Sequence, residues 1–250
     1  MLEVRQLVKR FGALAATDGA SFTVLPGELH ALIGPNGAGK TTLIHQISGA
    51  LRPDAGQVLF EGRDVTPLGI ARRVQAGLVR SFQISSLFGP CSVRDNLRLA
   101  VLARREAPPS WWRPARADVA ARAEADALLA RVGLASLADR VAGELAHGEQ
   151  RQLEVGLALA ARPRLLLLDE PLAGMGPDES ARMVELLQSL RAEGLTLLLV
   201  EHDMDAVFRL ADRVTTLVAG RVIASGEPAA IRAHAEVRRA YLGDELEAAR

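Results

Sequence analysis

Cysteine and net charge are almost absent from this sequence. Cys91 is the only cysteine in 250 residues, so an internal disulfide is excluded, and we expect a buried or half-buried thiol in a reducing compartment. Thirty basic residues balance thirty acidic ones. This balance argues against nucleic acid as a partner, because nucleic-acid-binding proteins usually carry a basic excess or a basic stripe.

Long hydrophobic runs are missing as well. The longest apolar stretches, residues 155–161 and 194–200, are far shorter than the roughly 18 to 20 residues needed to cross a bilayer. The N-terminal stretch MLEVRQLVKRFG alternates like a strand and lacks the apolar centre of a signal peptide. We therefore expect a chain that neither spans a membrane nor is secreted, with a globular fold.

Lysine is also scarce, and one lysine stands in a glycine-rich motif. Only Lys9 and Lys40 are lysines, and Lys40 belongs to LIGPNGAGKTTL, residues 32–43. In this spacing the backbone N–H groups of a loop surround the β- and γ-phosphates of a nucleotide, the lysine reaches the outer phosphates and the hydroxyl of Thr41 binds Mg²⁺. The expected phosphate-binding residues are Gly34, Pro35, Asn36, Gly37, Ala38, Gly39, Lys40, Thr41 and Thr42.

The context of this motif argues against a chance match in a turn. Residues 28–33 read as a short buried strand, and residues 40–51 read as an apolar-faced helix that begins near Gly39. A strand, a glycine-rich loop and a helix are the order that phosphate binding requires, because the N-terminus of the helix favours an anion. We therefore expect a phosphate loop.

Two adjacent carboxylates follow a second buried strand. The stretch LLLLDEP, residues 165–171, places Asp169 and Glu170 at the carboxyl end of that strand, where open α/β sheets bind ligands. Asp169 can hold Mg²⁺, directly or through water, and Glu170 can polarise the water that attacks the γ-phosphate. The alternative is an acidic helix cap after a core strand.

The order of strands and helices predicts an α/β fold. Short strands fill the first 60 residues, helical spacing dominates residues 87–159, and strands alternate with amphipathic helices after residue 164. We expect a P-loop NTPase core with a parallel sheet, an antiparallel β portion at the N-terminus and an inserted helical subdomain. The expected single domain, 1–250, divides into a core of 1–86 and 161–226, a helical subdomain of about 87–160, and a C-terminal helical tail of 227–250.

The stretch LAHGEQRQLEVGLALA, residues 145–160, adds a third motif. Together with the phosphate loop, the RSFQ stretch at 80–83, the acidic strand and the VEHD stretch at 200–203, it gives the order of motifs of ATP-binding-cassette (ABC) ATPases. The chain resembles this family over essentially its whole length. The glycine-rich signature is the most specific of these motifs, since other phosphate-loop enzymes lack it.

The resemblance implies further roles for single residues. Gln83 resembles the family's glutamine that touches Mg²⁺ and the attacking water, and His202 resembles the switch histidine that contacts the γ-phosphate. Catalysis would then rest on Glu170, His202 and Gln83, and the metal would be held by Thr41, Gln83 and Asp169. Phe11 is similar to the upstream aromatic that stacks on adenine, although a core aromatic at a strand end is the alternative.

The resemblance also implies a dimer in which each signature covers the ATP of the opposite subunit. The signature residues are Ala146, His147, Gly148, Glu149 and Gln150. The family commonly has serine where Ala146 stands and aspartate where Gly176 stands. Each change removes a polar contact across the dimer, worth of order 0.5 to 3 kcal/mol.

The signature, the stretch 170–180 and the tail VRRAYLGDE at 237–245 look most like the ATPase subunits of branched-chain amino-acid importers. The resemblance implies ATP and Mg²⁺, a second ATPase subunit that is identical or paralogous, two membrane-spanning permease subunits, and a periplasmic or extracellular binding protein. It implies a peripheral place at the cytoplasmic face of the inner membrane. ATPases for urea, amides and aromatic acids are closely similar, so the solute stays open, and a soluble ATP-driven clamp or signalling cassette is the alternative class.

Trp111 and Trp112 are the only tryptophans, in the proline-rich stretch 106–116. Local packing is the simpler interpretation, and an aromatic patch against a membrane subunit is the other.

Overall fold

The structure, a computed structural model, describes residues 1–81, 87–104 and 118–248. Gln83, Trp111 and Trp112 therefore lie outside the described residues, and their predicted roles stay predictions. The chain divides into two compact units: the first comprises 1–80, 164–171 and 187–250, and the second comprises 81–163 and 172–186. The domain boundaries expected from the sequence also stay a prediction.

An antiparallel sheet opens the first unit. It contains β1 (Leu2–Phe11), β2 (Leu14–Val24), β4 (Ala55–Phe60) and β5 (Arg63–Asp64), in the order β2-β1-β4-β5. Leu2 and Val4 alternate onto one buried face of β1, and an irregularity between Val4 and Leu7, where Gln6 has a φ of 48°, returns Leu7 to the same core. The predicted antiparallel portion at the N-terminus is confirmed.

A second sheet of the same unit is parallel except for one edge strand. Its order is β10-β9-β3-β8-β7-β6, with β3 (Leu29–Ile33), β6 (Leu78–Arg80), β7 (Leu165–Asp169), β8 (Thr196–Val200), β9 (Arg213–Val218) and β10 (Arg221–Gly226). Among the strands that the structure describes in this sheet, only β10 pairs antiparallel, with β9. Every residue of β3, β7 and β8 is buried, as expected for central strands covered on both faces.

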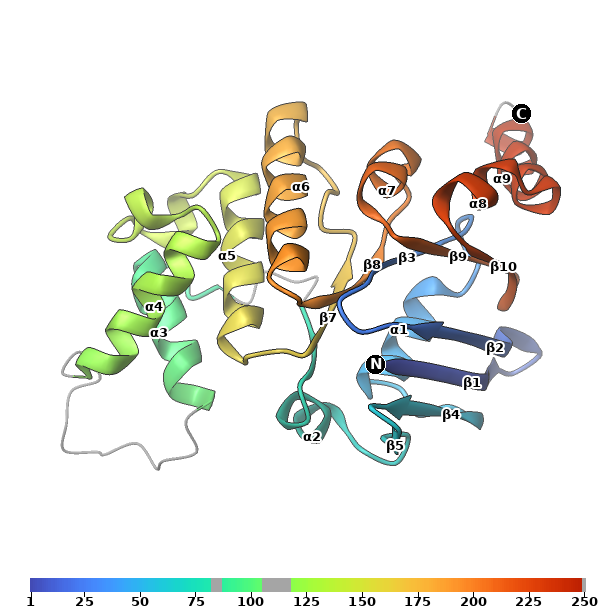
Figure 1. The fold of residues 1–250 in the computed structure, drawn as a ribbon, viewed down its shortest axis with the longest axis horizontal. Helices are drawn as coiled ribbons and strands as arrows, with labels where there is room; N and C mark the ends of the chain where they lie inside the picture. The colour runs from blue at the N-terminus through green and yellow to red at the C-terminus, as the bar shows by residue number, and fades with distance from the viewer. Residues whose placement is uncertain (82–86, 105–117, 249–250) are drawn as a thin grey trace. The chain divides into compact units, whose positions relative to one another are not determined.

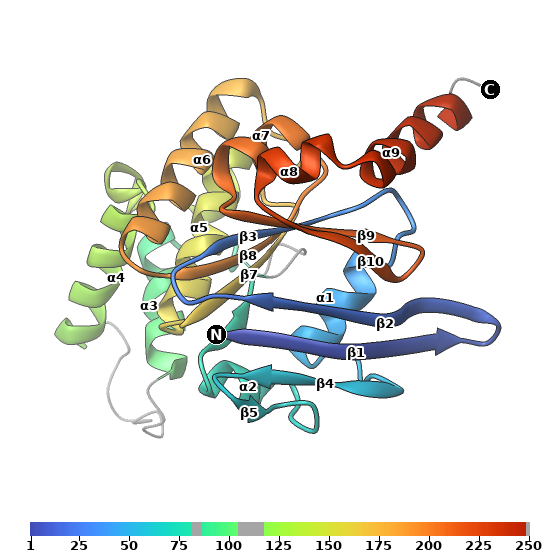
Figure 2. The same cartoon turned by 45° about the vertical axis from the view of Figure 1, so that its right-hand side comes forward.

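Successive residues of β3 pack on opposite faces of this sheet. Leu32 belongs to the core that joins both sheets and the helix α1 (Lys40–Ser48), which lies between them in Figures 1 and 2. Ala31 and Ile33 belong to a second core, formed with the helices α7 (Met204–Leu210), α8 (Pro228–Ala233) and α9 (Ala235–Ala248). The predicted parallel sheet with helices on both faces is confirmed.

A buried arginine closes the C-terminal end of α1. Arg73, in the short helix α2 (Ile70–Gln75), is 1% exposed and donates hydrogen bonds to the carbonyls of Gln46, Ile47, Leu68 and Thr66. Burial lowers the pKa of Arg73 to about 10, although the charge of Asp64 opposes this shift. The positive charge at the negative end of α1 complements the helix dipole, so α1 is held at the end opposite to the phosphate loop.

The second unit is helical. Its described residues form α3 (Val93–Arg104), α4 (Val119–Arg131), the short 3₁₀ segments Ala135–Leu137 and Ala142–Glu144, α5 (His147–Ala160) and the first part of α6 (Pro177–Ala192). The helices α3, α4 and α5 pack against one another, and Gly156 lets α5 approach Leu97 of α3, where a Cβ would lie 3.1 Å from the leucine Cδ2.

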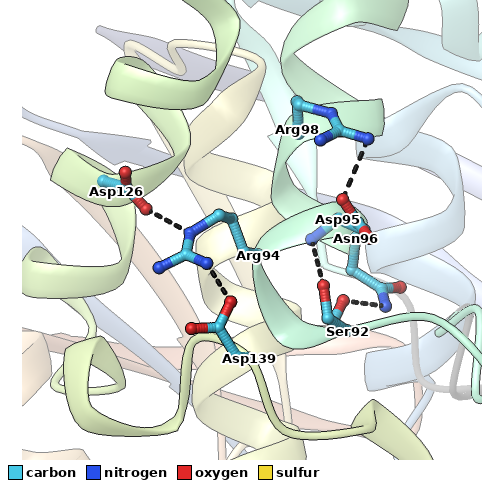
Figure 3. A network of polar contacts seen from close by, with 7 residues as sticks. All are labelled: Ser92, Arg94, Asp95, Asn96, Arg98, Asp126 and Asp139. Atoms are coloured by element: carbon cyan, nitrogen blue, oxygen red, sulfur yellow. Dashed lines mark hydrogen bonds and ion pairs between the residues drawn. The ribbon is translucent and has the colours of Figure 1, made fainter. Parts of the chain in front are cut away.

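A polar network ties α3 to its neighbours within this unit (Figure 3). Arg94 donates from Nε to Asp126 of α4 at 2.7 Å and from Nη1 to Asp139. These carboxylates, with Asp126 the larger contributor, raise the pKa of Arg94. In the described part of the chain, no helix has the length and apolar character of a membrane-spanning segment.

Candidate functional site

The phosphate loop has the glycines where its backbone demands them. Gly34 and Gly39 have φ angles of 155° and 99°, and a Cβ would lie 2.1 Å from the carbonyl oxygen of Leu217 and 2.0 Å from that of Ala16, respectively. Neither position can therefore accept a side chain. Gly37 has a φ of 76°, but an added Cβ would meet nothing within 4 Å, so only the backbone conformation favours glycine there.

The helix α1 begins near Gly39, as expected from the sequence: Gly39 is its N-cap and Lys40 its first residue. The Lys40 side chain turns back into the loop, because Nζ donates to the carbonyls of Gly34 at 2.6 Å and Pro35 at 3.0 Å. The residue is only 9% exposed. A buried ammonium and the positive end of a helix thus meet at one loop, an arrangement that attracts phosphate.

The register of the sheet places the phosphate loop and the acidic pair at the same end of the parallel strands, the carboxyl end. Leu32 of β3 pairs with Val200 of β8, and Val200 pairs with Asp169 of β7. Because these strands are parallel, Asp169 lies at the carboxyl end of β7, and the phosphate loop, Glu170 and His202 follow the carboxyl ends of β3, β7 and β8. These three strands are neighbours in the sheet (Figure 1). No helix begins at the acidic pair, since α6 starts at Pro177; the helix-cap alternative is wrong.

Asp169 is held by an arginine that the sequence interpretation missed. Its side chain is 2% exposed, and its Oδ2 accepts a hydrogen bond from Nη2 of Arg80, the last residue of β6, at 2.7 Å. His45 of α1 is electrostatically coupled to both groups: burial lowers the pKa of His45, Arg80 lowers it further, and Asp169 opposes this. The sequence signal that could have identified Arg80 is its position as a charged residue at the end of the apolar stretch GLVR.

Glu170 has an unusual backbone. Its φ is 48°, in the left-handed region that non-glycine residues seldom adopt, and its N–H donates to the carbonyl of Val200 at 2.9 Å. Such a conformation costs of order 1–3 kcal/mol and is concentrated at functional sites. The carboxylate is 39% exposed, and its Oε1 lies 3.9 Å from Nδ1 of His202. The acid and the histidine are therefore neighbours that solvent can reach.

The signature lies at the start of α5, as its glycine suggested. The N–H of Gly148 donates to Oε1 of Glu179 at 3.1 Å, and the N–H of Gly176 donates to Oε2 of the same carboxylate at 3.2 Å. These two hydrogen bonds lower the pKa of Glu179. Glu179 was not predicted from the sequence. The only sequence signal for it was an acidic residue shortly after Pro177.

The other signature residues make local contacts. Glu149 accepts a hydrogen bond from the N–H of Ala146 at 2.9 Å. Alanine has no side-chain oxygen that could accept a hydrogen bond from the N–H of Glu149, so the reciprocal capping box is not formed. Nε2 of His147 contacts the carbonyl of Ala173 at 3.2 Å, and Gln150 donates to that of Leu145 at 3.0 Å. The signature is therefore fixed to the loop that follows β7 in sequence.

Phe11 lies at the end of β1 and is 52% exposed. The core alternative for this aromatic is therefore wrong, and a ring open to solvent is what base stacking requires. Nζ of Lys9 lies 5.8 Å from the ring centroid. Stacking on adenine stays a prediction.

Comparison with known proteins agrees with the motifs. The family model described as ABC transporter matches residues 17–173, and one described as branched-chain amino acid ATP-binding cassette transporter matches residues 221–247. The high-affinity branched-chain amino acid transport ATP-binding proteins LivG of Escherichia coli and BraF of Pseudomonas aeruginosa are each 37% identical, over 98% of both chains.

Solved structures give the same result. The ADP conformation of MJ1267, an ATP-binding cassette of an ABC transporter, has a TM-score of 0.87 at 33% identity, covering 97% of this chain and 98% of that one. A nucleotide-free cassette from an ABC transporter has a TM-score of 0.85 at 30% identity, covering 96% and 98%. The family expected from the motifs is thus confirmed, and this chain belongs to the ATP-binding cassettes of ABC transporters.

Proposed function

We propose that this chain is the ATP-hydrolysing subunit of an ABC importer that takes up branched-chain amino acids or related small polar solutes through separate membrane subunits. The observation that carries this proposal is the likeness, over nearly the whole chain, to transport ATPases of that class, including the separate match of the C-terminal segment 221–247. An ATPase for another solute, such as urea or amides, is the nearest alternative.

ATP is the expected nucleotide. The N–H groups between Gly34 and Gly39 and the ammonium of Lys40 would hold its β- and γ-phosphates, and the Phe11 ring would stack on its base. The dipole of α1 adds to the attraction for phosphate. Lys40 already lies in the loop, 2.6 Å from the Gly34 carbonyl, so binding needs an exchange of its hydrogen-bond partners and no refolding.

The donor groups at this edge fit Mg²⁺. A threonine hydroxyl at the start of α1 and a buried carboxylate at the end of β7 are hard oxygen ligands, which this ion prefers. We assign Thr41 and Asp169 to the metal, with Gln83 as a third residue that lies outside the described ones. When bound, the ion supplies charge that stabilises the phosphate oxygens.

Hydrolysis would proceed by attack of one water on the γ-phosphorus. Glu170 accepts a proton from this water, the new P–O bond forms, and the bond from the γ-phosphorus to the bridging oxygen breaks, leaving ADP and phosphate. His202 would hold the γ-phosphate from the strand next to that of Glu170. The chain's part is to position the water and to stabilise charge.

A second ATPase subunit would complete the site. The Gly148 N–H at the start of α5 would cover the γ-phosphate bound by the opposite subunit. Ala146 and Gly176 remove two polar contacts across such a dimer, which favours a paralogous partner over an identical one. Light scattering of the Glu170→Gln variant with ATP tests this: a tight dimer of this chain alone would contradict the need for a paralogue.

Two permease subunits and a periplasmic or extracellular binding protein would make up the transporter, with this chain peripheral at the cytoplasmic face of the membrane. The test is to replace Lys40 by Ala in the native host. Uptake of labelled leucine, isoleucine and valine should fall, while urea uptake stays unchanged, and integral membrane proteins should co-purify with the tagged wild-type chain. Unchanged amino-acid uptake with loss of urea uptake would favour the alternative solute.

A further inference from the structure

Arg80 and Asp169 form an ion pair at the carboxyl edge of the parallel sheet. Arg80 ends β6, Asp169 ends β7, and Nη2 lies 2.7 Å from Oδ2. The exposed fractions of their side chains are 15% and 2%. The pair is therefore largely removed from water, at the carboxylate that we assign to Mg²⁺.

A carboxylate buried to this degree needs a positive partner. Without one, its desolvation would cost several kcal/mol. Arg80 supplies that charge in the absence of a metal. A bound Mg²⁺ would supply positive charge in its place, so the arginine and the metal ion would compete for one carboxylate.

Arg80 binds Asp169 through only one of its nitrogens. Only Nη2 donates to the carboxylate, and Nε of Arg80 is buried without a hydrogen-bond partner among the residues that the structure describes. A bidentate arginine would satisfy both groups and bind more strongly. Since Arg80 pairs in the sheet with Leu167, two residues before Asp169, only its long side chain spans the gap and can release the carboxylate without moving a strand.

We propose that Arg80 is a positioning residue that neutralises Asp169 before nucleotide binds and opposes binding of a divalent cation at the same carboxylate. Metal binding would then depend on the phosphates of ATP, whose charge favours Mg²⁺ over the resident arginine. The inference rests on the proposed function, because it takes Asp169 as a metal-binding residue.

The test compares wild type with Arg80→Leu and Arg80→Lys in two measurements. Thermal unfolding without metal or nucleotide should show a lower Tm for Arg80→Leu. A Mg²⁺ titration at fixed fluorescent ATP analogue should show the opposite change, with half-maximal binding at a Mg²⁺ concentration roughly tenfold lower, since one nearby positive charge is gone. Arg80→Lys, which keeps the charge, should lie near wild type in both measurements.

Two controls separate this role from a merely structural one. Arg72→Leu removes an exposed arginine of the neighbouring α2 and should change neither quantity. The double variant Arg80→Leu/Asp169→Asn, which leaves no buried charge, should regain the Tm and lose the Mg²⁺ dependence. If Arg80→Leu does not fold, the same Mg²⁺ titration is made with Arg80→Gln, which also lacks the charge.

The outcomes are distinct. A Mg²⁺ midpoint that is unchanged or higher in Arg80→Leu, with wild type binding ATP in a Mg²⁺-dependent way, would overturn this inference alone. Absence of nucleotide binding by wild type would overturn the proposed function with it.

Discussion

The carboxylate of Glu179 joins the N–H of Gly148 to the N–H of Gly176, with hydrogen bonds of 3.1 and 3.2 Å. One acid of α6 thus connects the signature glycine with the loop that precedes α6. A Cβ on Gly148 would lie 2.8 Å from Oε1 of Glu179. A side chain at this position would therefore displace the Glu179 carboxylate from its two hydrogen bonds within the chain itself.

The amide resonances of Gly148 and Gly176 should report the protonation of Glu179. Because these hydrogen bonds lower its pKa in the folded state, their stabilising effect is present above the unfolded value of about 4.5 and is lost as the pH falls through the lower folded value. In ¹H–¹⁵N spectra the two amides should shift together, with a midpoint below 4.5.

Glu179→Gln should abolish this common titration, whereas Asp178→Asn, at the exposed neighbouring acid, should preserve it. Independent midpoints for the two glycines would argue against a shared carboxylate.

Gly34→Ala and Gly37→Ala should differ sharply in stability. Both positions have positive φ, which costs an alanine about 1–2 kcal/mol. Only at Gly34 does the new Cβ also meet a backbone oxygen, at 2.1 Å. Urea unfolding should therefore show a loss of about 1 kcal/mol for Gly37→Ala and about 3 kcal/mol or more for Gly34→Ala. Equal losses would mean that the close approach to Leu217 does not exist.

Lys40→Ala should weaken ATP binding by about 100-fold, because two charge-assisted hydrogen bonds to phosphate oxygens would be lost. Calorimetry with Mg²⁺ measures this directly. Arg52→Ala, at an exposed cation a few residues after α1, is the control and should bind as wild type does. An undiminished affinity in Lys40→Ala would remove the phosphate-loop assignment.

Arg94→Leu should lower the free energy of unfolding by about 1 kcal/mol, since its two acidic partners are partly exposed. The network of Figure 3 would lose its connection between α3 and α4. A double-mutant cycle with Asp126→Asn should show coupling that shrinks in 1 M salt, where the Debye length is about 3 Å. Arg122→Leu, which replaces an exposed arginine of α4, is the matched control. An equal loss of unfolding free energy in this variant would show that the network does not stabilise the fold specifically.

Local sequence patterns were sufficient to predict the strand–loop–helix that contains Lys40 and the strand end at which Asp169 and Glu170 lie. In both places, apolar runs, glycine positions and charges within a dozen residues determine the structure. Helix α1 ends at Ser48, earlier than the apolar pattern to residue 51 suggested, because Gly49 adopts a left-handed C-cap.

Contacts between distant segments could not be predicted in the same way. Arg80 meets Asp169 only because β6 is the neighbour of β7, and strand order is not encoded in either segment alone. Glu179 reaches Gly148 across 31 residues of sequence. The exposure of Phe11 likewise depends on where the β1–β2 turn ends in the fold, since an aromatic at a strand end is compatible with core or surface.

The Glu170→Gln variant tests most directly whether Glu170 is the catalytic base of an ATPase. The amide keeps the shape of the side chain but cannot take the proton of the attacking water. ATP affinity and the hydrolysis rate should be measured on the same preparation. We expect unchanged ATP affinity and hydrolysis slower by roughly 10²- to 10⁴-fold. Wild-type turnover in Glu170→Gln, with ATP bound normally, would contradict this expectation.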